Sequence, residues 1–111
     1  TNQGLLALRA TIYMALLGKK GLCHIANLSF QKAHYAANKI NKLKNYKLKY
    51  SNNFFNEFII ETQHDTKKIK HHCLKNNMLI NVDSNYLIIS ITEKRTIDEI
   101  ELLIKSLDDF K

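Results

Sequence analysis

The sequence predicts a small α+β domain of two layers, in which helices pack on a mostly antiparallel sheet of three to four strands. Short stretches with alternating apolar residues predict the strands, and stripes with spacings of three and four predict the helices. The strands lie on either side of a single helical stretch, which favours antiparallel pairing. The 111 residues allow one domain with a modest core.

Residues 4–17 are almost entirely apolar, yet they are too short for a membrane span, which needs about 20 residues, and they contain Arg9. The stretch is apolar on more than one side, which predicts a helix that is buried on several faces. The rest of the chain is too small to cover it, so we expect another domain or subunit against it. Gly18 and Gly21, with lysines between them, predict a helix end and a turn.

A second helix is predicted over residues 22–43, because small and apolar residues recur on one face. This stripe consists of Leu22, Ala26, Ser29, Ala33, Ala36, Ile40 and Leu43. Its alanines favour close packing on a sheet or on another helix over a coiled coil.

Residues 46–50 predict a short strand, because tyrosine or leucine alternates there with lysine. This period places Tyr46, Leu48 and Tyr50 on the core side and the lysines on a solvated face. Residues 51–53, with the sequence Ser-Asn-Asn, predict a turn.

Residues 54–62 are aromatic and β-branched and predict a second strand. Glu57 and Glu61 share one face of it, and paired carboxylates can serve in acid–base catalysis. Charged residues on the solvent side of an edge strand are commoner than catalytic carboxylate pairs. We therefore expect both glutamates to be solvated strand residues without a catalytic role.

Asp65 or Thr66 can cap a short helix that continues to about residue 77. Its spacing turns Ile69 and Cys73 inward, and His72 is a further candidate for this inward face.

Residues 78–82 are a candidate for a short strand, residues 83–85 predict a turn, and residues 86–92 predict the clearest core strand. Thr96 and Glu99 have the spacing of a capping box at the start of the last helix. The core face of that helix has the spacing i, i+3, i+4, i+7 and consists of Ile100, Leu103, Ile104 and Leu107.

The formal charge of +7 suits nucleic acid or an anionic membrane surface. However, Arg9 and Arg95 are the only arginines, whereas nucleic-acid sites favour arginine. Lysine, asparagine and isoleucine are abundant together, as an AT-rich coding sequence would produce. We therefore expect no nucleic-acid or membrane partner. The alternative function is a free-standing basic α+β binding module for nucleic acid or a protein partner, without catalysis. A steep loss of nucleic-acid affinity with rising salt would identify the nucleic-acid form of this module.

Cysteine and histidine provide the candidates for a metal or nucleophile site: Cys23 beside His24, and His71 and His72 beside Cys73. Adjacent side chains on a helix point about 100° apart, so neither group converges on a metal. No third group that would orient a Cys–His pair can be identified. We expect no metal ligand and no catalytic residue in this chain, and two free cysteines packed as small hydrophobic residues in a reducing compartment.

Thr1, Asn2 and Gln3 are the most interesting polar group, because they stand where a long helix begins. Free backbone N–H groups and side chains at such a start bind phosphate readily. A plain helix cap at Thr1 or Asn2 is the alternative.

The sequence resembles the glycine cleavage system P-protein family in four segments that follow in the same order. They read TNQGLLALRATIYMALLGKKGL, FQKAHYAANKI, FFNEF and ITEKRTIDEIE. The forms TNQ, FFNEF and TEKRT are similar to subunit 1 of the two-subunit bacterial enzyme. The resemblance implies the C-terminal part of a longer polypeptide, with residues 1–21 as a connecting helix from a large domain and residues 22–111 as the C-terminal small domain.

The resemblance implies the aspartate-aminotransferase-like fold (fold type I) and the cofactor pyridoxal phosphate, bound mainly by the large domain or a partner subunit. The family decarboxylates glycine and transfers the aminomethyl group to the lipoyl arm of the H-protein. The implied partners are P-protein subunit 2 and the lipoylated H-protein, with glycine as substrate. This chain would complete a subunit interface and be inactive alone, in the cytoplasm of a bacterium or the mitochondrial matrix of a eukaryote.

In related folds, a threonine at the matching helix start reaches the cofactor phosphate of the neighbouring subunit. The resemblance therefore assigns this role to Thr1, with Asn2 and Gln3 as companions. The lysine that carries the cofactor in the family lies upstream of this stretch, and in two-subunit forms it belongs to the other subunit. No lysine of this chain is given that role.

Two departures from the family accompany this resemblance. The family usually has a longer loop with glycine and proline where residues 78–85 stand here, and the usual proline near Lys19 is absent. Within the FFNEF segment, we assign Phe55, Asn56 and Glu57 packing and strand roles rather than chemistry.

Overall fold

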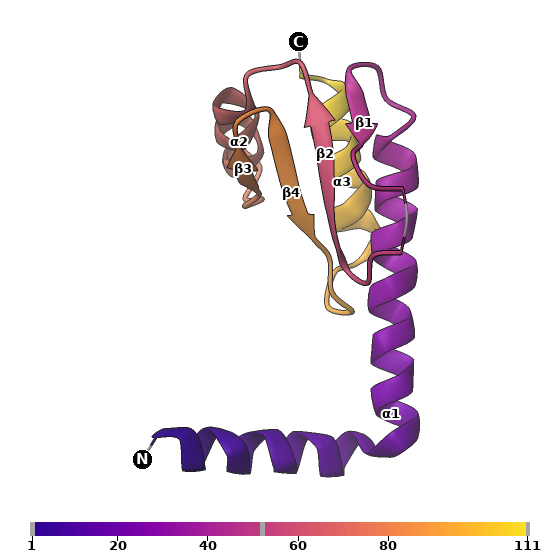
Figure 1. The fold of residues 1–111 in the computed structure, drawn as a ribbon, viewed down its shortest axis with the longest axis vertical. Coiled ribbons are helices and arrows are strands. Elements are labelled where there is room, and N and C mark those ends of the chain that lie inside the picture. The colour runs from indigo at the N-terminus through magenta and orange to yellow at the C-terminus, as the bar shows by residue number, and fades with distance from the viewer. Residues whose placement is uncertain (1, 52, 111) are drawn as a thin grey trace.

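The computed structural model describes residues 2–51 and 53–110, and these residues form an α+β fold of two layers (Figure 1). The elements are α1 (Asn2–Ile40), β1 (Tyr46–Leu48), β2 (Glu57–Thr62), α2 (Thr66–Lys75), β3 (Asn81–Asp83), β4 (Tyr86–Ser90) and α3 (Ile97–Asp108). The four strands in this part of the chain form one antiparallel sheet, in the order β1-β2-β4-β3. The predicted fold class is confirmed.

The first helix bends sharply at Gly18, where two helical segments meet. Gly18 has φ 62° and ψ −177°, a combination that is essentially restricted to glycine. The predicted helix end is therefore present at Gly18, but the predicted turn is wrong, because Lys19 and Gly21 already belong to the following helical segment. We call residues 2–17 the arm, and Figure 1 shows it running across the direction of the rest of α1.

The predicted stripe of the second helical segment is buried from its middle onward. Ser29, Ala33, Ala36 and Ile40 are buried, whereas Leu22 and Ala26 nearer the bend are half-buried. Because alanine has a small side chain, α1 can lie close to β1, β2 and α3 along this stripe.

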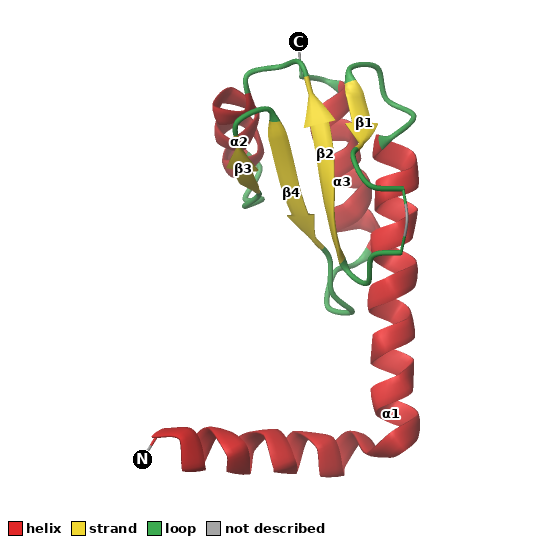
Figure 2. Cartoon of the chain, viewed as in Figure 1, coloured by secondary structure: helices red, strands yellow, loops and turns green. Residues whose placement is uncertain are grey.

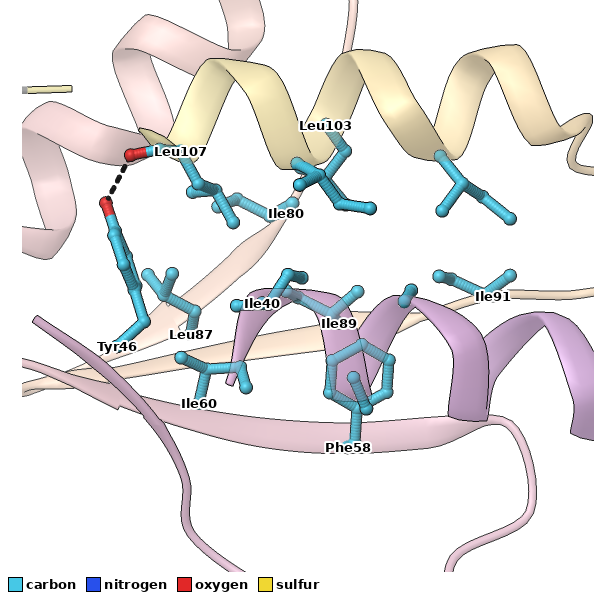
Figure 3. Packing of buried hydrophobic residues seen from close by; sticks show 14 of the residues in the cluster. Ile40, Tyr46, Phe58, Ile60, Ile80, Leu87, Ile89, Ile91, Leu103 and Leu107 are labelled. Carbon is cyan, nitrogen blue, oxygen red and sulfur yellow. Dashed lines mark hydrogen bonds between the residues drawn. The ribbon is translucent and has the colours of Figure 1, made fainter. Parts of the chain in front are cut away.

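The core fills the space between one face of the sheet and the helices (Figure 3). Its strand side alternates between buried and more exposed residues, as a half-buried sheet requires. The buried residues come from all three described helices, from β1, β2 and β4, and from the segments beside β3 and β4: Ala33, Ala36, Ala37, Ile40, Tyr46, Phe58, Ile60, Ile69, Cys73, Ile80, Leu87, Ile89, Ile91, Ile100, Leu103, Ile104 and Leu107. The predicted core faces of α2 and α3 are thus confirmed.

The position of β2 corrects one prediction. β2 pairs with β1 on one side and with β4 on the other, so it is an inner strand rather than an edge strand. Glu57 and Glu61 nevertheless share the face that points away from the core, as their alternation predicts. Glu61 accepts a hydrogen bond from Asn85 Nδ2 at 3.1 Å.

Several strands are shorter than the sequence predicts. β1 ends at Leu48, so Tyr50 is exposed rather than in the core. Lys49 Nζ lies 3.6 Å from the centroid of the Tyr86 ring. The lysine side chain thus covers part of the open face of the sheet. The turn predicted at residues 51–53 includes Asn52, which lies outside the described residues. β3 begins at residue 81 rather than 78, and β4 ends at residue 90 rather than 92.

The caps of the two shorter helices match their predictions. Asp65 caps α2 by accepting hydrogen bonds from the backbone N–H groups of Lys67 and Lys68. At α3, Thr96 Oγ1 accepts from the Glu99 N–H at 3.2 Å, and the Glu99 carboxylate accepts from the Thr96 N–H at 2.8 Å. This capping box lowers the pKa of Glu99, chiefly through the hydrogen bond from the Thr96 backbone.

The buried hydroxyl of Tyr46 predicts a loss of stability in alkali. It donates to the Leu107 carbonyl at 3.0 Å (Figure 3), and burial raises the pKa of Tyr46 to about 12. The unfolded chain releases this proton near its ordinary pKa of 10.0, so the contribution is intact below pH 10 and is lost as the pH rises toward 12. We expect a decline of about 1.4 kcal/mol per pH unit in this window, measured by urea unfolding.

The variant Tyr46→Phe separates this effect from the titration of the lysines, which occurs in the same range. Its stability should fall less steeply between pH 10 and 12 than that of the parent chain. Equal slopes in the two proteins would contradict the assignment to Tyr46.

Candidate functional site

The arm presents an apolar surface that no described residue covers. Residues 2–16 are all exposed, including the large side chains Leu5, Leu6, Leu8, Ile12, Tyr13, Met14 and Leu16. A helix that is apolar on all sides is normally buried in a larger body. Among the described residues, no helix is both long and apolar enough to cross a membrane. Within this chain, the arm is therefore an exposed apolar helix.

The arm begins at a polar and open helix start. Asn2 is the first residue of α1, and Asn2 and Gln3 are both exposed, whereas Thr1 lies outside the described residues. The first turn contains no acidic residue, and a Cβ added to Gly4 would meet no atom within 4 Å. Backbone N–H groups of a first turn lack partners within the helix and carry partial positive charge. This start can accept an anion such as phosphate, and that role stays a prediction.

A group of hydrogen bonds, which we call the junction cluster (Ser29, Lys32, Glu93 and Arg95), holds the loop before α3 against α1. Ser29 Oγ accepts from the Glu93 N–H at 3.0 Å. Lys32 Nζ donates to the carbonyl oxygens of Glu93 and Arg95, both at 2.6 Å. These bonds set the position of α1 relative to the rest of the domain, beyond the bend at Gly18.

Sequence reasoning missed the junction cluster, although one signal was present. Ser29 is a polar residue within the apolar stripe of its helix, and a buried polar side chain needs a hydrogen-bond partner. The partner lies 64 residues away along the chain, so local patterns do not identify it.

The FFNEF segment attaches the start of β2 to α1 through stacked rings. The ring of His34 lies between those of Phe30 and Phe54, with centroids 4.1 and 3.9 Å apart, and its Nε2 donates to the Phe54 carbonyl at 2.9 Å. The Asn56 carbonyl accepts a backbone bond that continues the sheet beyond β4. The packing role assigned to Phe55 is wrong within this chain, because Phe55 is 55% exposed.

The two cysteines differ in their surroundings. Cys73 is fully buried in α2, and burial raises the pKa of its thiol. Cys23 is exposed on α1, which corrects the prediction that both are packed as hydrophobic residues. Over residues 2–51 and 53–110, no three histidine, cysteine or acidic side chains are grouped so that they could hold a metal ion.

The bend at Gly18 should disappear when this residue is replaced by alanine. An added Cβ would meet no atom within 4 Å, so the substitution is opposed by the backbone torsion and not by crowding. The strain of such a conformation is about 1–3 kcal/mol for a residue with a Cβ, whereas alanine is the residue that most favours a continuous helix. A straight helix of 39 residues would be roughly 58 Å long, compared with a present longest dimension of 47 Å.

Small-angle X-ray scattering at dilutions where the chain is monomeric measures this change as a larger maximum dimension. Gly4→Ala is the matched control, because Gly4 also has open space around it but lies in regular helix. An unchanged dimension in Gly18→Ala would show that contacts of the arm, rather than Gly18, maintain the bend.

Comparison with known sequences gives a consistent result over nearly the whole chain. A family model described as "Glycine cleavage system P-protein" matches residues 1–107. A protein of Chloroherpeton thalassium named "Probable glycine dehydrogenase (decarboxylating) subunit 1" is 43% identical over 98% of this chain. The chain spans about a quarter of that relative, 26% of its length.

Solved structures show the same fold. A glycine decarboxylase (P-protein) of the glycine cleavage system, in inhibitor-bound form, matches 98% of this chain and 26% of its own, with a TM-score of 0.89 and 23% identity. A phosphoserine aminotransferase from Cytophaga hutchinsonii matches 91% of this chain and 29% of its own, with a TM-score of 0.70 and 14% identity. At these identities the likeness concerns the fold, which agrees with the aminotransferase-like fold that the resemblance implies.

Proposed function

The chain belongs to the glycine cleavage system P-protein family, and on this premise we propose that it is one part of a pyridoxal-phosphate-dependent glycine dehydrogenase (decarboxylating). The whole enzyme would decarboxylate glycine and transfer the aminomethyl group to the lipoyl arm of the H-protein. Since the chain spans only about a quarter of its relatives, it would be inactive alone and contribute to a complex with P-protein subunit 2. We place this complex in the bacterial cytoplasm, in keeping with its bacterial relatives.

The uncovered arm is the observation that carries this proposal. Burying apolar surface contributes roughly 25 cal/mol per Å², and the arm offers such surface on more than one side. We propose that residues 1–21 connect to a large cofactor-binding domain and that residues 22–111 form the small domain beside it. The arm would then be enclosed between that large domain and a second subunit, completing the interface.

The helix start of the arm fits the phosphate of the cofactor. Pyridoxal phosphate, when bound, supplies an electron sink for the bond that breaks as glycine loses its carboxylate. The contribution of this chain would be to hold the phosphate of a cofactor bound mainly elsewhere, through the backbone N–H groups of the first turn. Thr1 would add its hydroxyl, with Asn2 and Gln3 as further contacts. No carboxylate in the first turn opposes this anion.

Co-expression of the full-length subunit with subunit 2 tests the proposal. We expect cofactor absorbance that survives gel filtration, and glycine turnover that the isolated 111-residue chain lacks. Failure of the two subunits to co-purify would contradict the proposed complex. Glycine turnover by this chain alone would contradict the proposal that it is inactive without the rest of the enzyme.

The phosphate role has a separate test in the full-length subunit. Thr1→Ala should lower cofactor retention, because the hydroxyl that contacts the phosphate is removed. Thr11→Ala is the matched control, since Thr11 is exposed and its hydroxyl donates to the Ala7 carbonyl of the arm itself, at 2.9 Å. If the Thr1→Ala and Thr11→Ala subunits retained the cofactor equally well, Thr1 would cap the helix without contacting the phosphate.

A further inference from the structure

We draw no further inference here: the strongest candidate, the apolar groove where the end of β4 meets α3 (Figure 2), carries nothing, because Arg95 and Glu99 in its lining form an ion pair with each other and nothing in the structure shows what covers it.

Discussion

Replacement of Ile60 by alanine should lower the free energy of unfolding by about 3–4 kcal/mol. Ile60 is fully buried in β2, with Leu87 of β4 opposite it on one side and Leu48 of β1 on the other (Figure 3). Truncation removes the transfer free energy of three carbon atoms and leaves a cavity, since paired strands on both sides cannot collapse into it. The midpoint of urea unfolding should fall while the slope with urea concentration stays unchanged.

Ile59→Ala is the matched control for this substitution. Ile59 is the same residue type, adjacent in the same strand, but it points to the open face and is only half-buried. Its loss should cost about 1 kcal/mol, because less apolar surface returns to water and no enclosed cavity forms. If the two variants were equally destabilised, the open face would be as tightly packed as the core face, contrary to the structure.

The elements that local patterns define were predicted well. The buried face of α3 follows from a single amphipathic spacing, and its start follows from the Thr96–Glu99 capping box. The buried stripe of α1 follows equally from its spacing. In each case the determining interactions lie within one helix or between one helix face and the core, so about ten consecutive residues contain the necessary information.

Features that depend on distant partners were not predicted. Nothing within residues 54–62 shows that β4 pairs on the far side of β2, and so β2 was placed at an edge. Tyr50 continues the alternation of β1, but the strand ends at Leu48. Cys23 lies in an apolar sequence, yet its side chain is exposed. Burial at these positions is decided by tertiary pairing rather than by residue type.

The candidate site likewise combines features that local sequence predicts with features that depend on distant partners. The sequence predicts the apolar arm, because a helix that is apolar on more than one side needs cover. The bonds of Lys32 to two backbone carbonyls were not predicted, because those carbonyls lie more than sixty residues away and carry no side-chain signal. Nor does the sequence show that β3 is shorter than β4, because strand length here depends on pairing register.

The arm should respond to a charge very differently in the isolated chain and in the full enzyme. Leu8 is 55% exposed here, so Leu8→Lys should change the free energy of unfolding of this chain by less than about 0.5 kcal/mol. In the full-length subunit assembled with subunit 2, we expect the arm to be enclosed. The lysine would then be buried without a partner, and assembly should weaken by about 3 kcal/mol or more, which is roughly a 100-fold loss.

Leu74→Lys provides the control, because Leu74 is 52% exposed and lies on α2, away from the arm. Unfolding of the isolated variants and sedimentation of the co-expressed complexes give the two measurements. Weak assembly for Leu8→Lys alone, with both isolated chains stable, would identify the arm as buried interface. Full assembly of the Leu8→Lys enzyme would show that the arm stays in water, and the proposed enclosure between large domain and second subunit would then be wrong.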